Sequence, residues 1–280
     1  MSAGREPVAV TGDVMRGKRG LVMGVANNHS IAWGIARAAR EQGAELAFTY
    51  QGEQFGKRVA PLAKQAGSDI LLPCDVVDDH SVAAVFEAVG KEWVGLDFLV
   101  HAVAFSNKDE LQGLYADTTR ENFLQTMMIS CYSFTEVSRR AAALMPEGGS
   151  LLTMTYGGSV RVMPNYNVMG VAKAALEASV RYLASDYGPR NIRVNAISAG
   201  PVRTLAGSGV SDARQMFNYQ KRNAPLRRTV DISEVGHSAV YLLSDWSSGV
   251  TGEIHYVDSG YSTISMPQID ELKRLDARSE

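Results

Sequence analysis

An alternation of short apolar segments with helical segments most constrains the fold of this chain. Residues 18–24, KRGLVMG, form a short apolar segment that ends in glycine, and residues 31–42 follow as a helix that Gly43 ends. Residues 45–50, ELAFTY, form the next apolar segment. A strand, a glycine turn, a helix and a second strand within about thirty residues predict a βαβ unit.

The same alternation continues along the chain. We expect further strands at residues 69–74, 96–102, 150–155, 193–199 and 255–258, and further helices at 56–65, 81–92, 119–145, after Pro164, and at 231–243. Strands this apolar and this regularly separated predict a parallel sheet that is covered on both faces. We therefore predict an α/β protein with a single doubly wound, Rossmann-type domain and a seven-stranded parallel sheet at residues 15–266. A flexible leader at 1–14 would precede this domain, and a polar tail at 267–280 would follow it.

Composition narrows the class of protein. A net charge of -2 argues against a dedicated nucleic-acid or anionic-membrane binder, which is usually basic. The two cysteines, Cys74 and Cys131, do not form a CxxC pair, so we expect no disulfide framework and no metal site. We find no signal peptide and no apolar run of the ~18–20 residues that span a bilayer. These features predict a soluble, cytoplasmic protein.

The first βα turn is the expected phosphate site, because ligands of doubly wound sheets bind beyond the carboxyl ends of the strands. This turn lacks the GxGxxG pattern, but it keeps the properties that the pattern provides. Gly24 permits a sharp turn, Ala26 is small, and Ser30 places a hydroxyl at the start of the helix. An ordinary glycine-ended strand with a capped helix would show the same residues.

The end of the second strand indicates which dinucleotide binds. An acidic residue there binds the ribose diol of NAD, whereas a nearby arginine accepts the extra phosphate of NADP. Here Gln51 can bond a diol but carries no charge for a phosphate, and no basic residue occurs before Lys57. We therefore predict NADH. Asp75, after the third strand, can accept a hydrogen bond from the adenine amino group, or it can be an ordinary strand-end or capping aspartate.

Residues 153–173 carry the expected chemistry. A buried strand ends at Tyr156, a turn with Gly157 and Gly158 follows, and an Ala-rich helix is expected to carry Tyr166 and Lys173, seven residues apart. Two helical turns would place the last two side chains on one face. A phenol has a pKa near ~10, and a neighbouring lysine supplies the charge that tunes it as a donor. The competing interpretation is that these side chains only decorate the surface of a helix.

With these residues collected, the sequence resembles the NADH-dependent enoyl-acyl carrier protein reductases of the FabI type, within the short-chain dehydrogenase/reductase superfamily. The resemblance runs from about Met15 to Met266. Its most specific segments are GVANNHSIAWGIA at 24–36, FTYQGE at 48–53, PNYNVMGVAKAALEASVRYLA at 164–184, RVNAISAGPVRTLAGSGV at 193–210 and VDSGYS at 257–262.

The spacing between the catalytic residues also distinguishes this family. It has Tyr-x6-Lys, whereas the wider superfamily usually has Tyr-x3-Lys. Here Met169 stands four residues before Lys173 and cannot exchange a proton. This argues against the alternative function, that of a short-chain dehydrogenase/reductase acting on a carbonyl or alcohol.

The resemblance implies roles for individual residues. The catalytic residues would be Tyr166, Lys173 and a second tyrosine, Tyr156. The cofactor would be lined by Gly24, Ser30, Ile31, Gln51, Asp75, Val76, Val103, Lys173, Val202, Arg203, Thr204, Leu205 and Ala206, with Thr204 near the nicotinamide carboxamide. The substrate would meet Ser106, Tyr156, Met216 and Phe217. The chain departs from many relatives at Ala102 and Ala104, where these have serine and glycine.

The resemblance further implies the reaction and the partners. The expected reaction is the reduction of the trans-2 double bond of an enoyl thioester carried by acyl carrier protein, in bacterial type II fatty acid biosynthesis. The expected assembly is a homotetramer. Residues 205–217 are suited to form a lid over an apolar acyl slot, because Gly207 and Gly209 loosen its start and apolar residues up to Phe217 recur at helical spacing. Such a stripe can equally be plain core packing.

Overall fold

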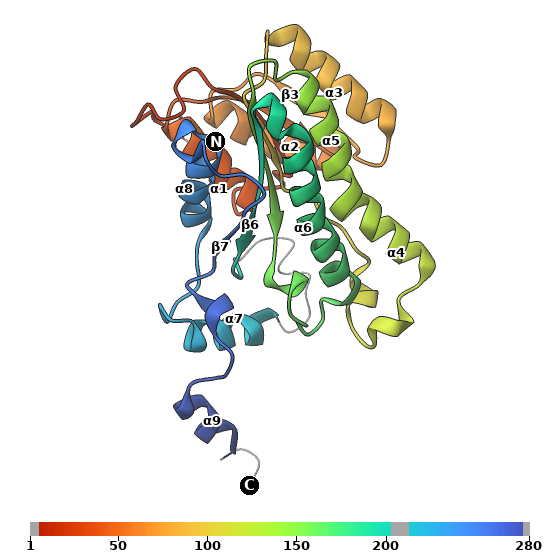
Figure 1. The fold of residues 1–280 in the computed structure, drawn as a ribbon, viewed down its shortest axis with the longest axis vertical. Coiled ribbons are helices and arrows are strands. Elements are labelled where there is room, and N and C mark those ends of the chain that lie inside the picture. The colour runs from red at the N-terminus through yellow and green to blue at the C-terminus, as the bar shows by residue number, and fades with distance from the viewer. Residues whose placement is uncertain (1–5, 203–212, 277–280) are drawn as a thin grey trace.

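The structure, a computed structural model, describes residues 6–202 and 213–276. Within these ranges seven strands form one sheet in the order β3-β2-β1-β4-β5-β6-β7, and all neighbouring strands are parallel (Figure 1). The strands are β1 (Arg19–Met23), β2 (Glu45–Tyr50), β3 (Leu71–Pro73), β4 (Phe98–His101), β5 (Gly149–Thr155), β6 (Ile192–Ala199) and β7 (Ile254–Val257). The predicted seven-stranded parallel sheet is confirmed.

Helices cover both faces of this sheet. They include α1 (Ile31–Glu41), α2 (Gly52–Gln65), α3 (Asp79–Glu92), α5 (Ser133–Ala143), α6 (Asn167–Tyr187) and α8 (Ile232–Leu243). Figure 1 shows α1 and α8 on one side of the sheet, and α5 and α6 on the other. The doubly wound arrangement follows from the apolar strands, because each strand has to bury side chains on both faces.

The two faces of the sheet can be read in consecutive residues. Val22 and Leu152 pack with residues of α1 and α8 in one core cluster. The residues just before them, Leu21 and Leu151, pack with residues of α3, α5 and α6 in the other. Successive side chains of a strand point to opposite faces, so each central strand contributes to both cores. Burying one such leucine contributes about 2 kcal/mol.

The long helix predicted at 119–145 is interrupted. It consists of α4 (Arg120–Met127), a π-helical segment (Met128–Tyr132) and α5. In the π-helical segment, Ser130 Oγ accepts a hydrogen bond from Phe105 N and donates one to Phe105 O, both at 3.0 Å. The segment thereby ties this helix to the loop after β4. π-Helical turns often occur at functional sites.

Both ends of the described chain are attached to the domain. In the segment expected as a flexible leader, Val8 N donates to Gln65 O and Thr11 N donates to Glu41 O, each at 2.8 Å. The polar tail contains a helix that the sequence analysis did not predict, α9 (Ile269–Asp276), which projects below the rest of the molecule in Figure 1. An ion pair of 2.7 Å between Glu271 and Arg222 joins it to α7 (Ala213–Asn223).

Within residues 6–202 and 213–276, no helix is both long enough and apolar enough to cross a bilayer.

Candidate active site at the carboxyl edge of the sheet

The predicted site residues follow the strands in the order of the sheet. Because all strands are parallel, the segments after them meet at one edge. Going along this edge from β3 to β6, the predicted residues are Asp75, Gln51, Gly24, Val103, Tyr156 and Val202. The chain order reverses direction between β1 and β4, which is the switch point where such folds bind ligands. An elongated ligand along this edge would meet these residues one after another.

The turn after β1 brings the chain close to the end of β4. Gly24 has a φ of 99°, and a Cβ at this position would lie 2.1 Å from the carbonyl oxygen of Ala102. Glycine is therefore required at position 24 for two reasons, the positive φ and the close approach of the Ala102 carbonyl. Ser30 Oγ accepts from Ala26 N at 3.0 Å and from Asn27 N at 3.1 Å. It holds the turn closed and makes no capping bond to α1, which begins at Ile31.

Two of the residues predicted to bind the cofactor are in contact. Gln51 Nε2 donates to Asp75 Oδ2 at 3.2 Å, and Asp75 Oδ1 accepts from Val77 N at 3.1 Å. The side chains of Val76 and Val103 are half-buried and pack against one core cluster. The edge next to β2 and β3 therefore presents an amide and a carboxylate, a combination that suits a diol better than a phosphate.

Tyr166 is not part of the helix that was expected to carry it. The residue caps α6, with φ −121° and ψ −25°, and the helix begins at Asn167. The prediction that Tyr166 and Lys173 lie on one face of the same helix is therefore wrong, because Tyr166 precedes the first helical residue. The ring is half-buried and lies edge-on to Tyr156, with 5.1 Å between centroids and 70° between planes. Burial raises the pKa of Tyr166 above its usual value.

Gly158 is needed because of a close approach, and its backbone conformation does not require glycine. The turn Gly157–Ser159 is a short 3-10 helix, and Gly158 does not have the positive φ of a loosened turn. Its importance is the close approach of Tyr166, because a Cβ at Gly158 would lie 2.5 Å from that ring. Gly158 thus leaves room for the ring of Tyr166.

Lys173 lies on α6 and is almost completely buried, with 6% of its surface exposed. Its Nζ donates to the carbonyl oxygen of Met154 at 2.9 Å. Burial lowers the pKa of Lys173 to about 8, and the nearby Cys131 and Glu177 oppose this shift. An ammonium has three donors, so Lys173 retains donors beyond the one directed at Met154.

His101 is a buried polar residue at this edge to which the sequence analysis gave no role. The structure pairs its Nδ1 with Thr153 Oγ1 at 3.1 Å and its Nε2 with Ser133 Oγ at 2.8 Å. Burial, together with the positive charge of the nearby Lys173, lowers the pKa of His101 to about 3. The ring is therefore neutral near pH 7, and it joins β4, β5 and α5 beneath the site.

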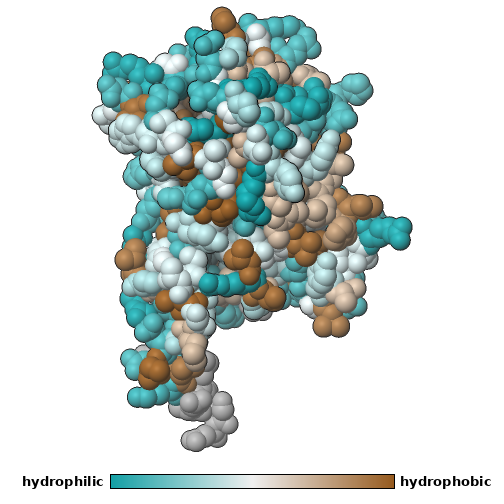
Figure 2. Space-filling model, viewed as in Figure 1, coloured by the Kyte–Doolittle hydropathy of each residue, from teal (hydrophilic) through white to brown (hydrophobic). Residues whose placement is uncertain are grey.

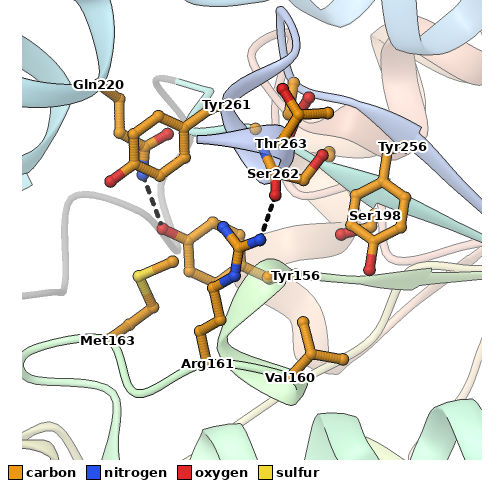
Figure 3. A pocket seen from close by; sticks show the side chains of 14 residues that line it. Tyr156, Val160, Arg161, Met163, Ser198, Gln220, Tyr256, Tyr261, Ser262 and Thr263 are labelled. Carbon is orange, nitrogen blue, oxygen red and sulfur yellow. Dashed lines mark hydrogen bonds between the residues drawn. The ribbon is translucent and has the colours of Figure 1, made fainter. Parts of the chain in front are cut away.

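A cavity of about 310 Å³ opens beside Tyr156. Figure 3 shows the side chain of Gln220, from α7, at the hydroxyl of Tyr156, and Arg161 donating to the carbonyl oxygen of Ser262. The residues that line this cavity and were not predicted are Gly157, Val160, Arg161, Met163, Ser198, Ala199, Gly200, Gln220, Tyr256, Asp258, Tyr261, Ser262 and Thr263. Two sequence features could have indicated some of them. One is the segment VDSGYS at 257–262, and the other is Gln220, a polar residue at helical spacing from Met216 and Phe217.

The predicted substrate residues occupy different places. Ser106 is buried and bonded to Thr126 Oγ1 at 2.9 Å, so its hydroxyl faces α4, and it does not line this cavity. Met216 and Phe217 are half-buried on α7, the helix expected in the lid. The residues predicted at 203–206, Arg203, Thr204, Leu205 and Ala206, lie outside the described residues. Within the described ranges, no group of three or more metal-binding side chains is present.

Comparisons with known proteins agree with this geometry. The family model described as "Enoyl-(Acyl carrier protein) reductase" matches residues 24–262. The chain is 70% identical to "Enoyl-[acyl-carrier-protein] reductase [NADH] 2" of Rhizobium meliloti (strain 1021), over 94% of this chain and 98% of the relative.

Two solved structures are similar to the chain throughout. One is FabI from Candidatus Liberibacter asiaticus, with TM-score 0.90 and 58% identity over 92% of this chain and 100% of the other. The second is the reductase from Anaplasma phagocytophilum in complex with NAD, with TM-score 0.90 and 53% identity over 94% of this chain and 98% of the other. The chain therefore belongs to the enoyl-(acyl carrier protein) reductase family.

Proposed function

We propose that this protein is an NADH-dependent enoyl-acyl carrier protein reductase of bacterial type II fatty acid biosynthesis. The observation that carries the proposal is the contact between Tyr156, which follows β5, and Tyr166, which precedes α6, with 5.1 Å between their ring centroids. The buried Lys173 donates to the carbonyl oxygen of Met154, two residues before Tyr156. Met169, four residues before Lys173, is buried against Leu111 and Val168 and supplies no acid. This arrangement favours reduction of a double bond over reduction of a ketone.

The residues along the carboxyl edge fit a dinucleotide. Gly24 and Ser30 would face the pyrophosphate together with the first amides of α1, which begins at Ile31. Gln51 would bond the adenosine ribose and Asp75 the adenine, beside Val76. Val103 and Val202 would line the nicotinamide half. When bound, NADH would supply a hydride to the carbon β to the thioester carbonyl.

Tyr166 would serve as the donor for the charge that develops on the thioester oxygen. A donor held where negative charge appears can be worth about 3 kcal/mol. Burial raises the pKa of Tyr166, so the phenol stays protonated and able to donate throughout the neutral range. Tyr156, edge-on to Tyr166, would shape the acyl pocket or assist protonation at the α carbon.

Lys173 would hold the nicotinamide ribose. Its bond to Met154 O uses one donor and fixes the direction of the side chain. The remaining donors can reach a diol, and the positive charge would stabilise the developing enolate. With a pKa of about 8, the ammonium form predominates at pH 7.

The cavity beside Tyr156 would accept part of the acyl chain of a substrate bound to acyl carrier protein. Its volume of about 310 Å³ and its apolar residues Val160 and Met163 suit a short aliphatic segment. Met216 and Phe217, on α7, would extend this apolar surface. Ser106, bonded within the α4 cluster, would act on the substrate indirectly, by supporting the loop after β4.

A homotetramer is the proposed assembly. Figure 2 shows tan and brown side chains gathered over α5 and α6. Large apolar side chains exposed on α4, the π-helical segment and α6 are Leu124, Met128, Tyr132, Val171 and Tyr182. Exposed apolar patches of this kind support an interface between subunits. A stable, active monomer in light scattering would contradict the assembly.

Family membership supports a cytoplasmic location.

A substrate comparison tests the proposed reaction. The purified protein is mixed with NADH and either a short trans-2-enoyl thioester or a panel of ketones and aldehydes, and the nicotinamide absorbance is followed. We expect the enoyl thioester to be consumed with the higher kcat/KM. Consumption of NADH with the carbonyl panel alone would instead indicate a carbonyl-reducing member of the wider superfamily.

A further inference from the structure

Gln220 is a buried amide on a helix whose other polar side chains mostly face outward. Only 5% of the surface of Gln220 is exposed, whereas its neighbours Asn218 and Lys221 are exposed. A buried amide is costly unless it is hydrogen-bonded. Figure 3 shows Gln220 reaching from α7 into the cavity, where its Nε2 lies 3.1 Å from the phenolic oxygen of Tyr156.

The direction of this hydrogen bond decides what Tyr156 can do. An amide nitrogen donates and has no lone pair to accept with. The phenolic oxygen of Tyr156 is therefore the acceptor, and its own hydrogen has to point to a different acceptor. Because Tyr156 lines the cavity, that hydrogen is available to a polar group bound there. Burial raises the pKa of Tyr156 and the bond from Gln220 opposes this shift, so the phenol remains a neutral donor.

The hydrogen bond from Gln220 to Tyr156 also restrains Tyr166. The ring of Tyr156 stands edge-on to Tyr166, at 70° between their planes. A rotation of the Tyr156 side chain would therefore disturb the edge-on contact between the two rings. Gln220 thus acts at one end of a row formed by Gln220, Tyr156 and Tyr166.

The position of Gln220 on α7 links this row to the acyl pocket. Gln220 follows Met216 by four residues and Phe217 by three. Residues at these spacings lie on the same face of a helix. The helix face proposed to contact the acyl chain is therefore the face that holds Tyr156.

We propose that Gln220 is a positioning residue that directs the phenolic hydrogen of Tyr156 into the acyl cavity. The inference rests on the proposed function, because it assigns Gln220 to the same active site. Gln220 itself does not contact the reacting atoms. Its effect on the reaction passes through Tyr156, and this makes the proposal testable by combining substitutions.

The test compares Gln220→Met, Tyr156→Phe and the double variant. Methionine keeps the length of the side chain but removes the amide donor. Losing one neutral hydrogen bond should lower kcat/KM for a short enoyl thioester by about three- to tenfold, while the Kd for NADH stays the same. In the Tyr156→Phe background, Gln220→Met should cause no further loss. Losses that multiply in the double variant, or a weakened NADH affinity, would overturn the proposal.

A reversal of the hydrogen bond gives a second variant. In Gln220→Glu the carboxylate can only accept, so it draws the phenolic hydrogen away from the cavity. We expect this variant to lose more activity than Gln220→Met. Activity equal to that of the unmodified protein would contradict the proposed direction. Gln268→Met is the matched control, because Gln268 is exposed and should tolerate the same change without loss.

A spectroscopic measurement separates this inference from the proposed function. Protein labelled with 13Cζ-tyrosine gives a Tyr156 signal, assigned by its absence in Tyr156→Phe. Gln220→Met should shift that signal, and Gln268→Met should leave it in place. A signal that does not shift in Gln220→Met would overturn the inference even for an active enzyme. A shifted signal without any enoyl reduction would instead place the failure in the proposed function.

Discussion

Lys173 Nζ donates a hydrogen bond of 2.9 Å to the carbonyl oxygen of Met154, two residues before Tyr156. The bond joins α6 to the end of β5, the two elements on either side of the turn that carries the tyrosines. It fixes the ammonium at the buried side of the site, where burial lowers the pKa of Lys173 to about 8. The position and the charge of Lys173 can be tested separately.

Replacing Lys173 should weaken NADH binding and turnover together. Hydrogen bonds from a charged group contribute about 1.5–3 kcal/mol, so Lys173→Met should weaken NADH affinity about ten- to a hundredfold. Lys173→Arg keeps the charge and should retain part of the affinity. Fluorescence titration with NADH measures both variants, and a Lys173→Met protein with unchanged affinity would contradict the assigned role.

The pH dependence of NADH binding follows from the same pKa. The protonated form of Lys173 binds the ribose, and its fraction falls as the pH rises through about 8. The Kd for NADH should therefore increase over that range in the unmodified protein. In Lys173→Met this dependence should disappear.

Removing the hydroxyl of Tyr166 should affect the reaction and spare NADH binding. The hydrogen bond to the thioester oxygen strengthens in the transition state, so Tyr166→Phe should lower kcat about a hundredfold. NADH affinity should stay within about twofold, since the lost bond does not involve the cofactor's binding groups. Tyr115→Phe, at an exposed tyrosine, is the control. Loss of NADH binding in Tyr166→Phe would reverse the roles of Tyr166 and Lys173.

Cofactor preference should depend on Gln51 and Asp75 together. We expect NADH to be preferred over NADPH in kcat/KM, because the edge at β2 offers an amide bonded to a carboxylate. Gln51→Arg should narrow this preference only partly, since the new guanidinium would pair with Asp75. Gln51→Arg combined with Asp75→Asn should narrow it further. Equal use of the two cofactors by the unmodified protein would show that Gln51 does not select NADH.

His101 predicts how stability changes in acid. Its pKa is about 3 in the folded protein, and the unfolded value is 6.5. Between these values the unfolded chain binds a proton that the folded chain does not, so stability falls as the pH falls below about 6.5. From pH 6.5 to pH 5 the loss from this one group is about 1–2 kcal/mol. Urea unfolding of His101→Asn should show a shallower loss over that range, and an unchanged slope would contradict the assignment.

The fold was predictable because its signals are local and repeated. Residues 45–50 show β2 directly, and the Asp231 capping box, in which Asp231 and Glu234 bond each other's backbone, marks the start of α8. The cofactor edge was predictable for a related reason, because parallel strands bring their ends together. Gln51 and Asp75 could be placed at the same edge without any knowledge of their contact.

The arrangement inside the site could not be predicted from spacing. Tyr166 and Lys173 are seven residues apart, but the chain enters the helix only after Tyr166, with Asn165 and Asn167 both at positive φ. Gly158 reads as a turn residue, and its close contact with the Tyr166 ring is visible only in three dimensions. Gln220 lies 64 residues after Tyr156, and no local pattern pairs the two side chains.

The destination of the hydride tests the proposed reduction of the enoyl double bond most directly. The protein is given NADH that carries deuterium at the transferred position, together with a short trans-2-enoyl thioester, and the product is analysed by NMR. We predict a saturated thioester with deuterium on the carbon β to the carbonyl, and a product that forms about a hundredfold more slowly with Tyr166→Phe. Deuterium on a carbon that bears a new hydroxyl, or no saturated thioester at all, would contradict it.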